Sequence, residues 1–348
     1  MNIEQLKREL VLAIPDSGVL FERAVEACKK RPPPSRYRRK LEAIREDTLK
    51  CIDRAYKVLE NHLRKVVETS PFIENLHPLF RDLLLLNINV DEYKVCLSRL
   101  NSSRRIIGKI YHESRKRIKT ASGIRETLTA RRTFFGRIFS VLETLTECLK
   151  KVRSFQEAFL RLPEVDTELP AAVIAGAPNV GKSTVLRALT RAKPKVSPYP
   201  FTTRELIIGI FERGDLRVQL IDTPGLLDTP LEDKNRIERQ AILAMRHLAS
   251  LIIFVIDPTE TCGFPLEFQK TVFDQIVSSF SDTQVVKVVN KIDLATQEHL
   301  DNARKFFGGS DIVYISADKK LNLNLLESVI EKVFREEAQS SQKKELGS

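Results

Sequence analysis

Cysteine is scarce in this chain and its five copies are never closely spaced. They form no Cys-x-x-Cys pair and lie at Cys28, Cys51, Cys96, Cys148 and Cys262. Scattered cysteines in odd number are typical of a reducing compartment, and they argue against a disulfide framework or a zinc site. The five histidines show no metal-ligand spacing either. We therefore expect an intracellular protein without a disulfide framework or bound zinc.

Long hydrophobic runs are also lacking. The longest, Leu83–Leu86 and Leu251–Ile256, fall far short of the about 18 residues that a membrane-spanning helix needs. The first seven residues have no charged stretch followed by an apolar one, as a secretory signal would. Hydrophobic residues nevertheless make up 42% of the chain, which is enough to build cores in a protein of 348 residues. We expect a cytoplasmic protein of two domains that does not bind membranes.

Acidic residues are in short supply only in the first half. Residues 1–170 contain 34 Lys and Arg against 23 Asp and Glu, whereas residues 171–348 contain 23 of each. The formal net charge of +11 therefore lies entirely in the first half. Its densest part, residues 104–137, has only Glu113 and Glu126 as acids. The basic residues there are Arg104, Arg105, Lys109, Arg115, Lys116, Arg117, Lys119, Arg125, Arg131, Arg132 and Arg137.

Such a run is either a solvated face or a binding surface for a polyanion. The acids that would neutralise it at i,i+4 are nearly missing, so a polyanion is favoured. RNA fits better than a membrane surface, because the run lacks the apolar face that an interfacial helix requires. No known RNA-binding motif is present, so we expect contacts to phosphates that read shape rather than sequence.

Glycine is almost absent before residue 170, and apolar residues there recur at helical spacing. The spacing predicts one long helix near residues 41–66, another near 135–159 and a third over 93–119, with a short helical segment before Pro32–Pro34. Long helices with short connections favour an antiparallel bundle. We assign residues 1–166 to a basic helical domain.

After Pro170 the pattern changes to short β-branched runs separated by helical stretches. This alternation indicates a mostly parallel sheet with helices on both faces. We therefore predict an α + α/β fold, with residues 167–338 forming the second domain and residues 339–348 a flexible polar tail. The expected strands cover residues 171–175, 206–211, 216–221, 251–256, 285–289 and 312–315.

A glycine-rich loop follows the first of these strands and precedes a helix. It matches G-x-x-x-x-G-K-[ST], whose backbone N–H groups surround phosphates at a helix N-terminus. Lys182 is expected to reach the β- and γ-phosphates, and the Ser183 hydroxyl to bind Mg²⁺. The predicted nucleotide-binding residues here are Gly176, Ala177, Pro178, Asn179, Val180, Gly181, Lys182, Ser183 and Thr184.

Asn290-Lys291-Ile-Asp293 follows another predicted strand, at the edge where open α/β sheets bind ligands. The Asp293 carboxylate can accept hydrogen bonds from the ring N–H and the exocyclic amine of guanine, whereas adenine offers the wrong pattern. Ser316-Ala317 is expected to present a backbone N–H to guanine O6, although Asp318 departs from the lysine that is commoner there. These motifs predict a GTP site.

Asp222-Thr-Pro-Gly225 ends a third strand. Asp222 suits a water-mediated Mg²⁺ contact, and the Gly225 N–H suits the γ-phosphate. Thr202 and Thr203 offer hydroxyls to the same metal, with Thr203 the preferred ligand. The expected Mg²⁺ residues are therefore Ser183, Thr203 and Asp222, and the expected catalytic residues are Lys182, Thr203, Gly225 and Asn179.

With these motifs the sequence resembles translation-factor-type P-loop GTPases, and more narrowly the nucleolar GTP-binding (NOG) family of ribosome-assembly GTPases. The resemblance extends from about Phe72 to Lys291. Its segments include His77–Leu83, Val152–Phe155, Arg161–Pro163, Pro178–Ser183, Phe201–Thr203, Asp222–Gly225, Pro230–Asp233 and Cys262–Phe264.

The resemblance implies a helical domain fused to a Ras-like domain that acts on the large ribosomal subunit precursor and its rRNA, with ribosomal proteins or other assembly factors as further partners. Eukaryotic members continue well past the GTPase domain. The chain looks like the shorter, archaeal-type version, so a nucleolar location is expected only if the source is eukaryotic. A monomer is expected away from the ribosome.

Hydrolysis poses a specific question at Leu226. Ras-like enzymes orient the attacking water with a glutamine at this position, and leucine cannot do so. Either hydrolysis is slow, or another group replaces the glutamine. In the potassium-activated GTPases that the chain resembles, an asparagine at the position of Asn179 helps to bind K⁺ against the phosphates. The alternative for Asn179 is that it only shapes the loop.

The predicted function is a GTPase that binds rRNA on a maturing large subunit and is released or switched by GTP hydrolysis. Its cofactors would be GTP and Mg²⁺, with K⁺ in addition if Asn179 binds it. One alternative is a GTP sensor that does not hydrolyse, which Leu226 keeps open. Another is a GTPase of tRNA modification, although the cysteine-containing C-terminal motif of that class is missing.

Overall fold

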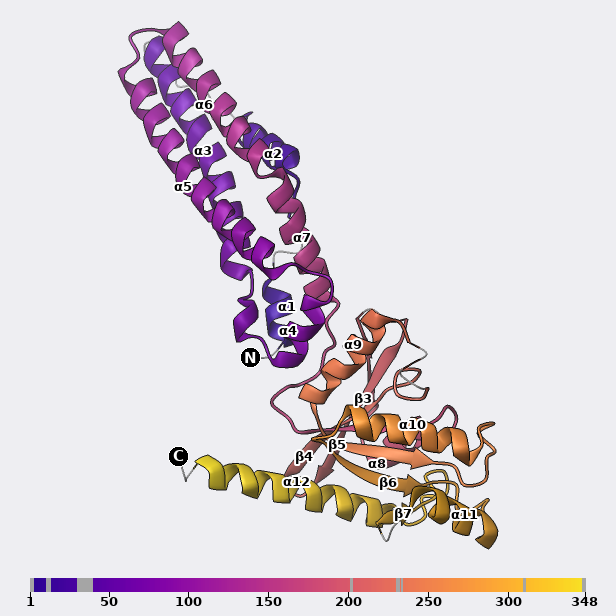
Figure 1. Cartoon of the computed structure of the whole chain (residues 1–348). Coiled ribbons are helices and arrows are strands. Elements are labelled where there is room, and N and C mark those ends of the chain that lie inside the picture. The colour runs from indigo at the N-terminus through magenta and orange to yellow at the C-terminus, as the bar shows by residue number, and fades with distance from the viewer. Residues whose placement is uncertain are drawn as a thin grey trace. The chain divides into compact units, whose positions relative to one another are not determined.

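The computed structural model describes residues 3–10, 14–29, 40–200, 203–229, 232, 234–308 and 311–345. They form two compact units, which are described separately below (Figure 1). The first unit contains Ile3–Asn75 and Asn87–Leu160, and the second contains Leu76–Leu86 and the chain from Arg161 onward. The segment Leu76–Leu86, predicted to belong to the helical domain, therefore packs with the second unit. No helix in the described ranges is long and apolar enough to cross a membrane.

The first unit is a helical bundle. In Figure 1, α3, α5 and α6 run side by side, and α2 packs on α3 and α6. The predicted apolar stripe of α3 is buried, including Ile52, Leu59 and Leu63, which confirms that helix. The helices are α1 (Ile3–Glu9), α2 (Ser17–Lys29), α3 (Lys40–Thr69), α5 (Val90–Thr120), α6 (Ile124–Thr144) and α7 (Thr146–Leu160), with a 3₁₀ turn at Ile73–Asn75.

The stretch predicted as one helix over 135–159 is in fact two, because α6 ends at Thr144 and α7 begins at Thr146. The Thr146 hydroxyl donates to the Glu143 carbonyl at 2.9 Å and pairs with the Ser17 hydroxyl at 2.8 Å. Side chains that bond nearby backbone groups compete with the helical ladder, which accounts for the break.

Cys28 of α2 and Cys51 of α3 form a disulfide, so the prediction of none was wrong. The two cysteines are 23 positions apart in sequence and match no motif. They meet because the apolar faces of α2 and α3 pack against each other, and this contact depends on tertiary structure rather than on spacing. Cys96, Cys148 and Cys262 are buried free thiols.

The second unit contains a seven-stranded sheet in the order β2-β3-β4-β1-β5-β6-β7. β1 pairs in parallel with β4 and β5, β5 with β6 and β6 with β7, whereas β2–β3 and β3–β4 are antiparallel. The predicted, mostly parallel sheet is therefore confirmed. The strands are β1 (Ala171–Ala175), β2 (Lys195–Pro198), β3 (Glu205–Arg213), β4 (Leu216–Asp222), β5 (Ala249–Ile256), β6 (Gln284–Val289) and β7 (Ile312–Tyr314).

Sequence analysis did not predict β2. Only one of its four residues, Ser197, is buried, so the strand carries no apolar run. It lies at the edge of the sheet, where it pairs only with β3. An edge strand needs no buried faces, and a hydrophobic pattern therefore cannot reveal it.

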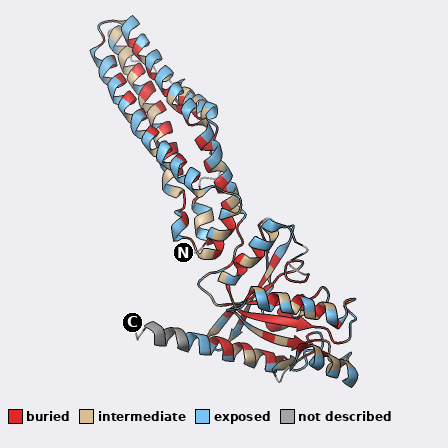
Figure 2. Ribbon diagram, viewed as in Figure 1, coloured by how far each residue is buried: buried red, intermediate tan, exposed pale blue. Residues whose placement is uncertain are grey.

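Helices cover both faces of this sheet, and the strands between them are the most buried part of the unit (Figure 2). On one face, residues of α8 and α12 join the same core as Ile253 and Val255 of β5. On the other, Phe273 of α10 and Phe307 of α11 pack around Phe254 in edge-on and tilted ring contacts. The helices are α4 (Pro78–Leu85), α8 (Lys182–Leu189), α9 (Arg236–Ala244), α10 (Leu266–Ser279), α11 (Gln297–Phe307) and α12 (Leu323–Glu345).

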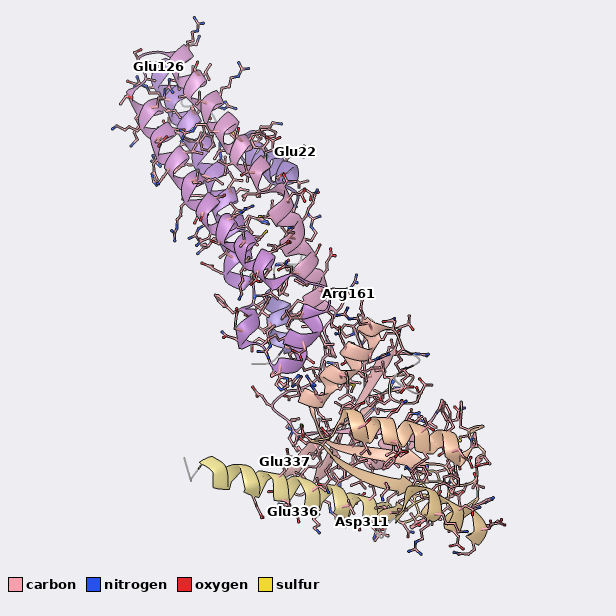
Figure 3. The ribbon with its side chains drawn as sticks, in the orientation of Figure 1. Glu22, Glu126, Arg161, Asp311, Glu336 and Glu337 are labelled. Carbon is pink, nitrogen blue, oxygen red and sulfur yellow. A yellow bond between two sulfur atoms is a disulfide. The ribbon has the colours of Figure 1, made fainter. Side chains whose placement is uncertain are left out.

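The C-terminal helix is longer than predicted. α12 continues to Glu345, so residues 339–345 of the predicted flexible tail are helical. Glu336 and Glu337, labelled in Figure 3, lie on α12 between its last core residue, Phe334, and this extension. The sequence missed this because the last turns have no apolar periodicity to mark them as helix.

Candidate functional site

The loop between β1 and α8 has the geometry of a phosphate-binding loop. Gly176 and Gly181 have φ of 138° and 103°, and Asn179 has φ of 60°. A Cβ atom at Gly176 would collide with the Val255 carbonyl, and one at Gly181 with the Asn290 side chain. The N–H groups of Thr184 and Val185 donate to Gly181, so α8 begins there. The first N–H groups of a helix lack intrahelical partners and favour an anion.

Lys182 lies inside this loop. Its ammonium donates to the Gly176 and Ala177 carbonyls, each at 2.8 Å, and the side chain is 7% exposed. Burial lowers the pKa of Lys182, while Asp228 and Asp222 act in the opposite direction. The ammonium is thus a fixed positive charge inside the loop, with two carboxylates nearby.

Ser183 and Asp222 meet at the start of α8 and the end of β4. The Ser183 hydroxyl donates to Asp222 Oδ2, and Asp222 is fully buried. Burial raises the pKa of Asp222, against the hydrogen bond from Ser183 and the charge of Lys182. Its Oδ1 has no hydrogen-bond partner in the part of the chain that the structure describes. Mg²⁺ prefers oxygen ligands. A hydroxyl oxygen and a buried carboxylate oxygen without a hydrogen-bond partner are such ligands, so Ser183 and Asp222 fit that metal.

The predicted threonine ligand does not join them. Thr203 lies on an exposed bend before β3, and no hydrogen bond among the described residues links it to Ser183 or Asp222. Its loop is closed by a bond from the Tyr199 N–H to the Arg204 carbonyl at 3.1 Å. The buried Tyr199 hydroxyl also donates to Ala241 of α9 at 2.6 Å, which anchors the loop. Thr202 lies outside the described residues, as do Pro230, Leu231 and Asp233.

The loop after β4 places Gly225 against an acid that the sequence analysis missed. Gly225 has φ of 73°, and its N–H donates to Asp228 Oδ2 at 2.7 Å. The same oxygen is 3.9 Å from the Lys182 ammonium. Asp228 lies three residues after Gly225, but no motif marks it. Leu226 is 2% exposed, so its apolar side chain cannot hold a water molecule, as predicted.

On the guanine side, Asn290 connects three loops. Its amide donates to the Val180 carbonyl at 3.0 Å, and its carbonyl oxygen accepts from the Ala317 N–H at 3.0 Å. The Ala317 N–H therefore donates to Asn290 in this structure. The prediction from the sequence is that Ser316-Ala317 presents a backbone N–H to guanine O6. Ser316 is buried, and its hydroxyl accepts from the Lys319 N–H. The Asp293 carboxylate is exposed, as a residue that contacts a base requires.

Lys291 is paired with an acid that the motifs did not include. Its ammonium donates to Asp257 Oδ2 at 2.7 Å. Asp257 is fully buried, and burial raises its pKa, but hydrogen bonds from Lys291 and Thr259 outweigh burial and leave the pKa lowered. Asp257 directly follows β5 at the same sheet edge as Asp222. That position was the signal that could have identified it.

Asn179 is exposed in the loop, and its amide donates to the Cys262 carbonyl at 3.5 Å. This bond is consistent with a loop-shaping role and leaves the Asn179 carbonyl oxygen available to a cation. Among the described residues, no group of three or more His, Cys, Asp or Glu side chains could hold a metal ion.

The basic residues of the run over 104–137 lie on α5 and α6 and are not all unpaired. Three are neutralised by acids of neighbouring helices: Arg104 by Glu60, Arg115 by Asp53 and Arg137 by Glu113. The expectation that acids were nearly missing counted only i,i+4 partners and overlooked these contacts between helices. Glu126, at the end of the α5–α6 hairpin (Figure 3), instead accepts from the Ser122 N–H at 2.7 Å. No ion pair within the described residues involves Arg105, Lys109, Lys116, Arg117, Lys119, Arg125, Arg131 or Arg132.

A phosphate loop, a Mg²⁺ site and a guanine-recognition motif at one edge of a mostly parallel sheet define the second unit as a P-loop GTPase domain. Residues 171–291 match the family model described as 50S ribosome-binding GTPase. Residues 10–166 match the model described as the NOG1 N-terminal helical domain. The chain thus joins a NOG1-type N-terminal helical domain to a GTPase domain of the ribosome-binding type, which confirms the resemblance found in the sequence.

Curated relatives agree with this assignment. Nucleolar GTP-binding protein 1 of Drosophila melanogaster is 30% identical over 292 residues, which cover 84% of this chain and 44% of the relative. The Arabidopsis thaliana protein of the same name is 36% identical over 238 residues, which cover 68% and 36%. This chain thus matches less than half of the length of either relative. A solved Plasmodium falciparum structure described as a nucleolar GTP-binding protein 1 is 29% identical, with a TM-score of 0.45, and covers 53% of this chain and 98% of its own.

Proposed function

We propose that this protein binds and hydrolyses GTP on a maturing large ribosomal subunit, and that hydrolysis switches its affinity for the rRNA there. The observation that carries the proposal is the combination of a phosphate loop and a guanine-recognition motif at one sheet edge with a NOG1-type helical domain. That domain presents eight basic residues for which no ion pair is found among the described residues. The relatives' name supports an action in the nucleolus of a eukaryotic cell, or in the cytoplasm of a cell without one.

The chemistry follows from the residues at the sheet edge. Backbone N–H groups of residues 179–184 would bind the α- and β-phosphates, and Lys182 would neutralise charge that develops between the β- and γ-phosphates. Ser183 and Asp222 would hold Mg²⁺, with Thr203 joining when its loop closes on the nucleotide. The metal would supply electrostatic stabilisation of the phosphate oxygens. The Gly225 N–H would bind the γ-phosphate.

Specificity for guanine would come from Asp293, whose exposed carboxylate accepts from two donors on the base. Hydrolysis without an activator would be slow, because the buried Leu226 cannot orient water. A potassium ion bound by the Asn179 carbonyl oxygen would supply the missing positive charge. The loops around Thr203 and Gly225 would report which nucleotide is bound.

RNA binding would rest on α5 and α6. Arg105, Lys109 and Lys116 share one face of α5 at positions i, i+4 and i+11, and all three are exposed. Such a row suits the phosphates of a folded RNA, whose shape it would recognise without reading bases. The three ion-paired arginines, Arg104, Arg115 and Arg137, would contribute less. Ribosomal proteins or other assembly factors would complete the binding site.

A second function is favoured by one observation. Because Leu226 is buried and apolar, the protein could act as a GTP sensor in which binding alone changes affinity for the ribosome. Measured turnover separates the two: a sensor binds GTP but releases no phosphate, even in the presence of large subunits.

The test is sedimentation of the full chain with purified large ribosomal subunits, loaded either with a non-hydrolysable GTP analogue or with GDP. We expect co-sedimentation with large subunits in the triphosphate state and release in the diphosphate state. The Lys182→Ala variant, which cannot bind nucleotide, should show no difference between the two. Equal co-sedimentation of wild-type protein in both states, or preference for small subunits, would refute the proposal.

A further inference from the structure

Asp228 occupies a position that the motifs did not assign to any residue. One of its carboxylate oxygens accepts the Gly225 N–H at 2.7 Å and is 3.9 Å from the Lys182 ammonium. These are the two groups that a γ-phosphate would be expected to contact in a P-loop GTPase. The carboxylate of Asp228 thus makes contacts that an oxygen of the γ-phosphate would otherwise make.

The surroundings of Asp228 do not compensate its charge fully. The residue is 7% exposed, and its second oxygen, Oδ1, is buried without a hydrogen-bond partner among the described residues. Asp222 is also close enough for its pKa to be raised by the charge of Asp228, a smaller effect than that of burial. Two buried carboxylates therefore share one buried ammonium, that of Lys182. Burying a carboxylate with an unsatisfied oxygen costs folding free energy, so we look for a role of Asp228 that offsets this cost.

The backbone of the loop gives Asp228 a means to withdraw. It lies between Gly225, which has φ of 73°, and Thr229, the last residue described before Pro230. Lys234 spans the loop by donating to the Gly225 carbonyl at 3.1 Å and to the Thr229 hydroxyl at 3.0 Å. These two bonds hold the loop closed around Asp228 without involving its carboxylate, so the side chain can leave while the bonds of Lys234 persist.

We propose that the Asp228 carboxylate competes with the γ-phosphate of GTP for the Gly225 N–H and for the charge of Lys182. GDP has no phosphate at this position and leaves Asp228 in place, whereas GTP must displace it. Asp228 therefore lowers the preference of the site for GTP over GDP. This inference rests on the proposed GTP site.

The simpler alternative is that Asp228 only caps the turn at Gly225. A capping residue would stabilise the loop for every nucleotide alike, so its loss would weaken GTP and GDP binding together. A competitor of the γ-phosphate has a different signature, because its loss strengthens binding of the triphosphate specifically. The ratio of the two affinities separates these roles.

The experiment measures the dissociation constants of fluorescent GDP and of a fluorescent, non-hydrolysable GTP analogue, with Mg²⁺ present, for the full chain. The variants are Asp228→Ala and Asp228→Asn. The asparagine is nearly isosteric and keeps an oxygen that can accept the Gly225 N–H, so it should fold even if the alanine variant does not; thermal unfolding checks both. The matched control is Asp274→Asn, which removes an exposed acid of α10 whose ion-pair partner among the described residues is Lys270.

We expect both Asp228 variants to shift the GTP-analogue-to-GDP affinity ratio toward the triphosphate by roughly tenfold, equivalent to about 1.4 kcal/mol. The Asp274→Asn control should leave the ratio unchanged. An unchanged ratio in both Asp228 variants, or a shift toward GDP, would overturn the inference while leaving the GTP site intact. Failure of the wild-type protein to bind either nucleotide would instead refute the proposed function.

Discussion

The side-chain amide of Asn290 donates to the Val180 carbonyl oxygen 3.0 Å away, across 110 positions of sequence. Its carbonyl oxygen accepts from the Ala317 N–H at the same distance. The buried Asn290 side chain thus links its own segment, which approaches the base, to the phosphate loop at Val180 and to the segment that contains Ala317. The two halves of the nucleotide are expected to bind to a framework whose parts are fixed relative to one another before the ligand arrives.

Asn290→Ala should therefore weaken binding of GTP and GDP equally. The variant leaves the Val180 carbonyl and the Ala317 N–H without their partner, at about 1–3 kcal/mol for each buried group. We expect at least a tenfold loss of affinity for both nucleotides and a lower free energy of unfolding in denaturant. Asn324→Ala, at an exposed position of α12, is the control. A loss confined to one nucleotide would contradict this role for Asn290.

The pair of Lys291 and Asp257 leads to a prediction about stability and pH. Lys291→Ala removes the ammonium from a fully buried carboxylate, which should destabilise the domain by about 3 kcal/mol at pH 7. The pKa of Asp257 is lowered in the folded protein, so its stabilising contribution is complete above the unfolded value near 3.8 and is lost as the pH falls through the lowered pKa.

Chemical denaturation of wild-type and variant protein between pH 7 and pH 3 tests this directly. The difference in unfolding free energy should shrink as the pH falls, because the unpaired, buried Asp257 carboxyl of the variant takes up a proton at a higher pH than the paired carboxylate of the wild-type protein. Lys287→Ala is the control, because Lys287 is a β6 residue whose ammonium donates, within the described part of the chain, to the carbonyl oxygens of Phe307 and Gly308 and to no carboxylate. A difference that instead grew below pH 4 would show that Lys291 does not stabilise the Asp257 carboxylate.

The fold could be predicted from the sequence wherever one element buries a periodic face. The stripe of α3 and the apolar strand β1 are local patterns with one structural solution each. The break at Leu145, the edge strand β2 and the Cys28–Cys51 bridge could not be predicted. Each depends on a tertiary contact that no local pattern marks: Ser17 beside Thr146, β3 beside β2, and one helix packed on another.

The same distinction applies to the candidate site. Lys182, Ser183 and Asp222 follow from motifs, because close backbone approach and metal binding dictate residue types at fixed spacing. Asp228 and Asp257 were missed, since each acts through a contact with a residue of another segment. Their chemistry is visible only when β1, β4, β5 and β6 bring their carboxyl ends to one edge of the sheet.

Asn179 allows a test of the potassium hypothesis. Phosphate release from GTP should be faster in KCl than in NaCl at equal ionic strength, because the K⁺ that Asn179 would bind offsets charge developing on the phosphates. Asn179→Gly is the matched variant, since glycine adopts the φ of 60° without strain but lacks the amide oxygen. It should turn over GTP equally slowly in both salts. Equal wild-type rates in KCl and NaCl would refute the hypothesis and leave Asn179 with its loop-shaping role.

The exposed row on α5 should carry much of the affinity for RNA. Replacing Arg105, Lys109 and Lys116 together by glutamate should weaken binding of the protein to large-subunit rRNA by at least a hundredfold at low salt, and should flatten the salt dependence of binding. The control changes the net charge by the same amount on the second unit, with Lys193, Lys305 and Lys332 replaced by glutamate. If the two triple variants lose affinity equally, the effect is one of net charge, and α5 is not the RNA-binding surface.

Whether this chain is a guanine-nucleotide switch can be measured most directly at Asp293. The measurement compares affinities for GTP, ATP and XTP in the wild-type protein and in Asp293→Asn. The carboxylate accepts from the two donors of guanine, whereas the asparagine amide donates to the 2-oxo group of xanthine. We predict that the wild-type protein binds GTP at least a hundredfold more tightly than ATP or XTP, and that the variant prefers XTP. Equal wild-type affinity for GTP and ATP, or unchanged GTP affinity in the variant, would contradict the account.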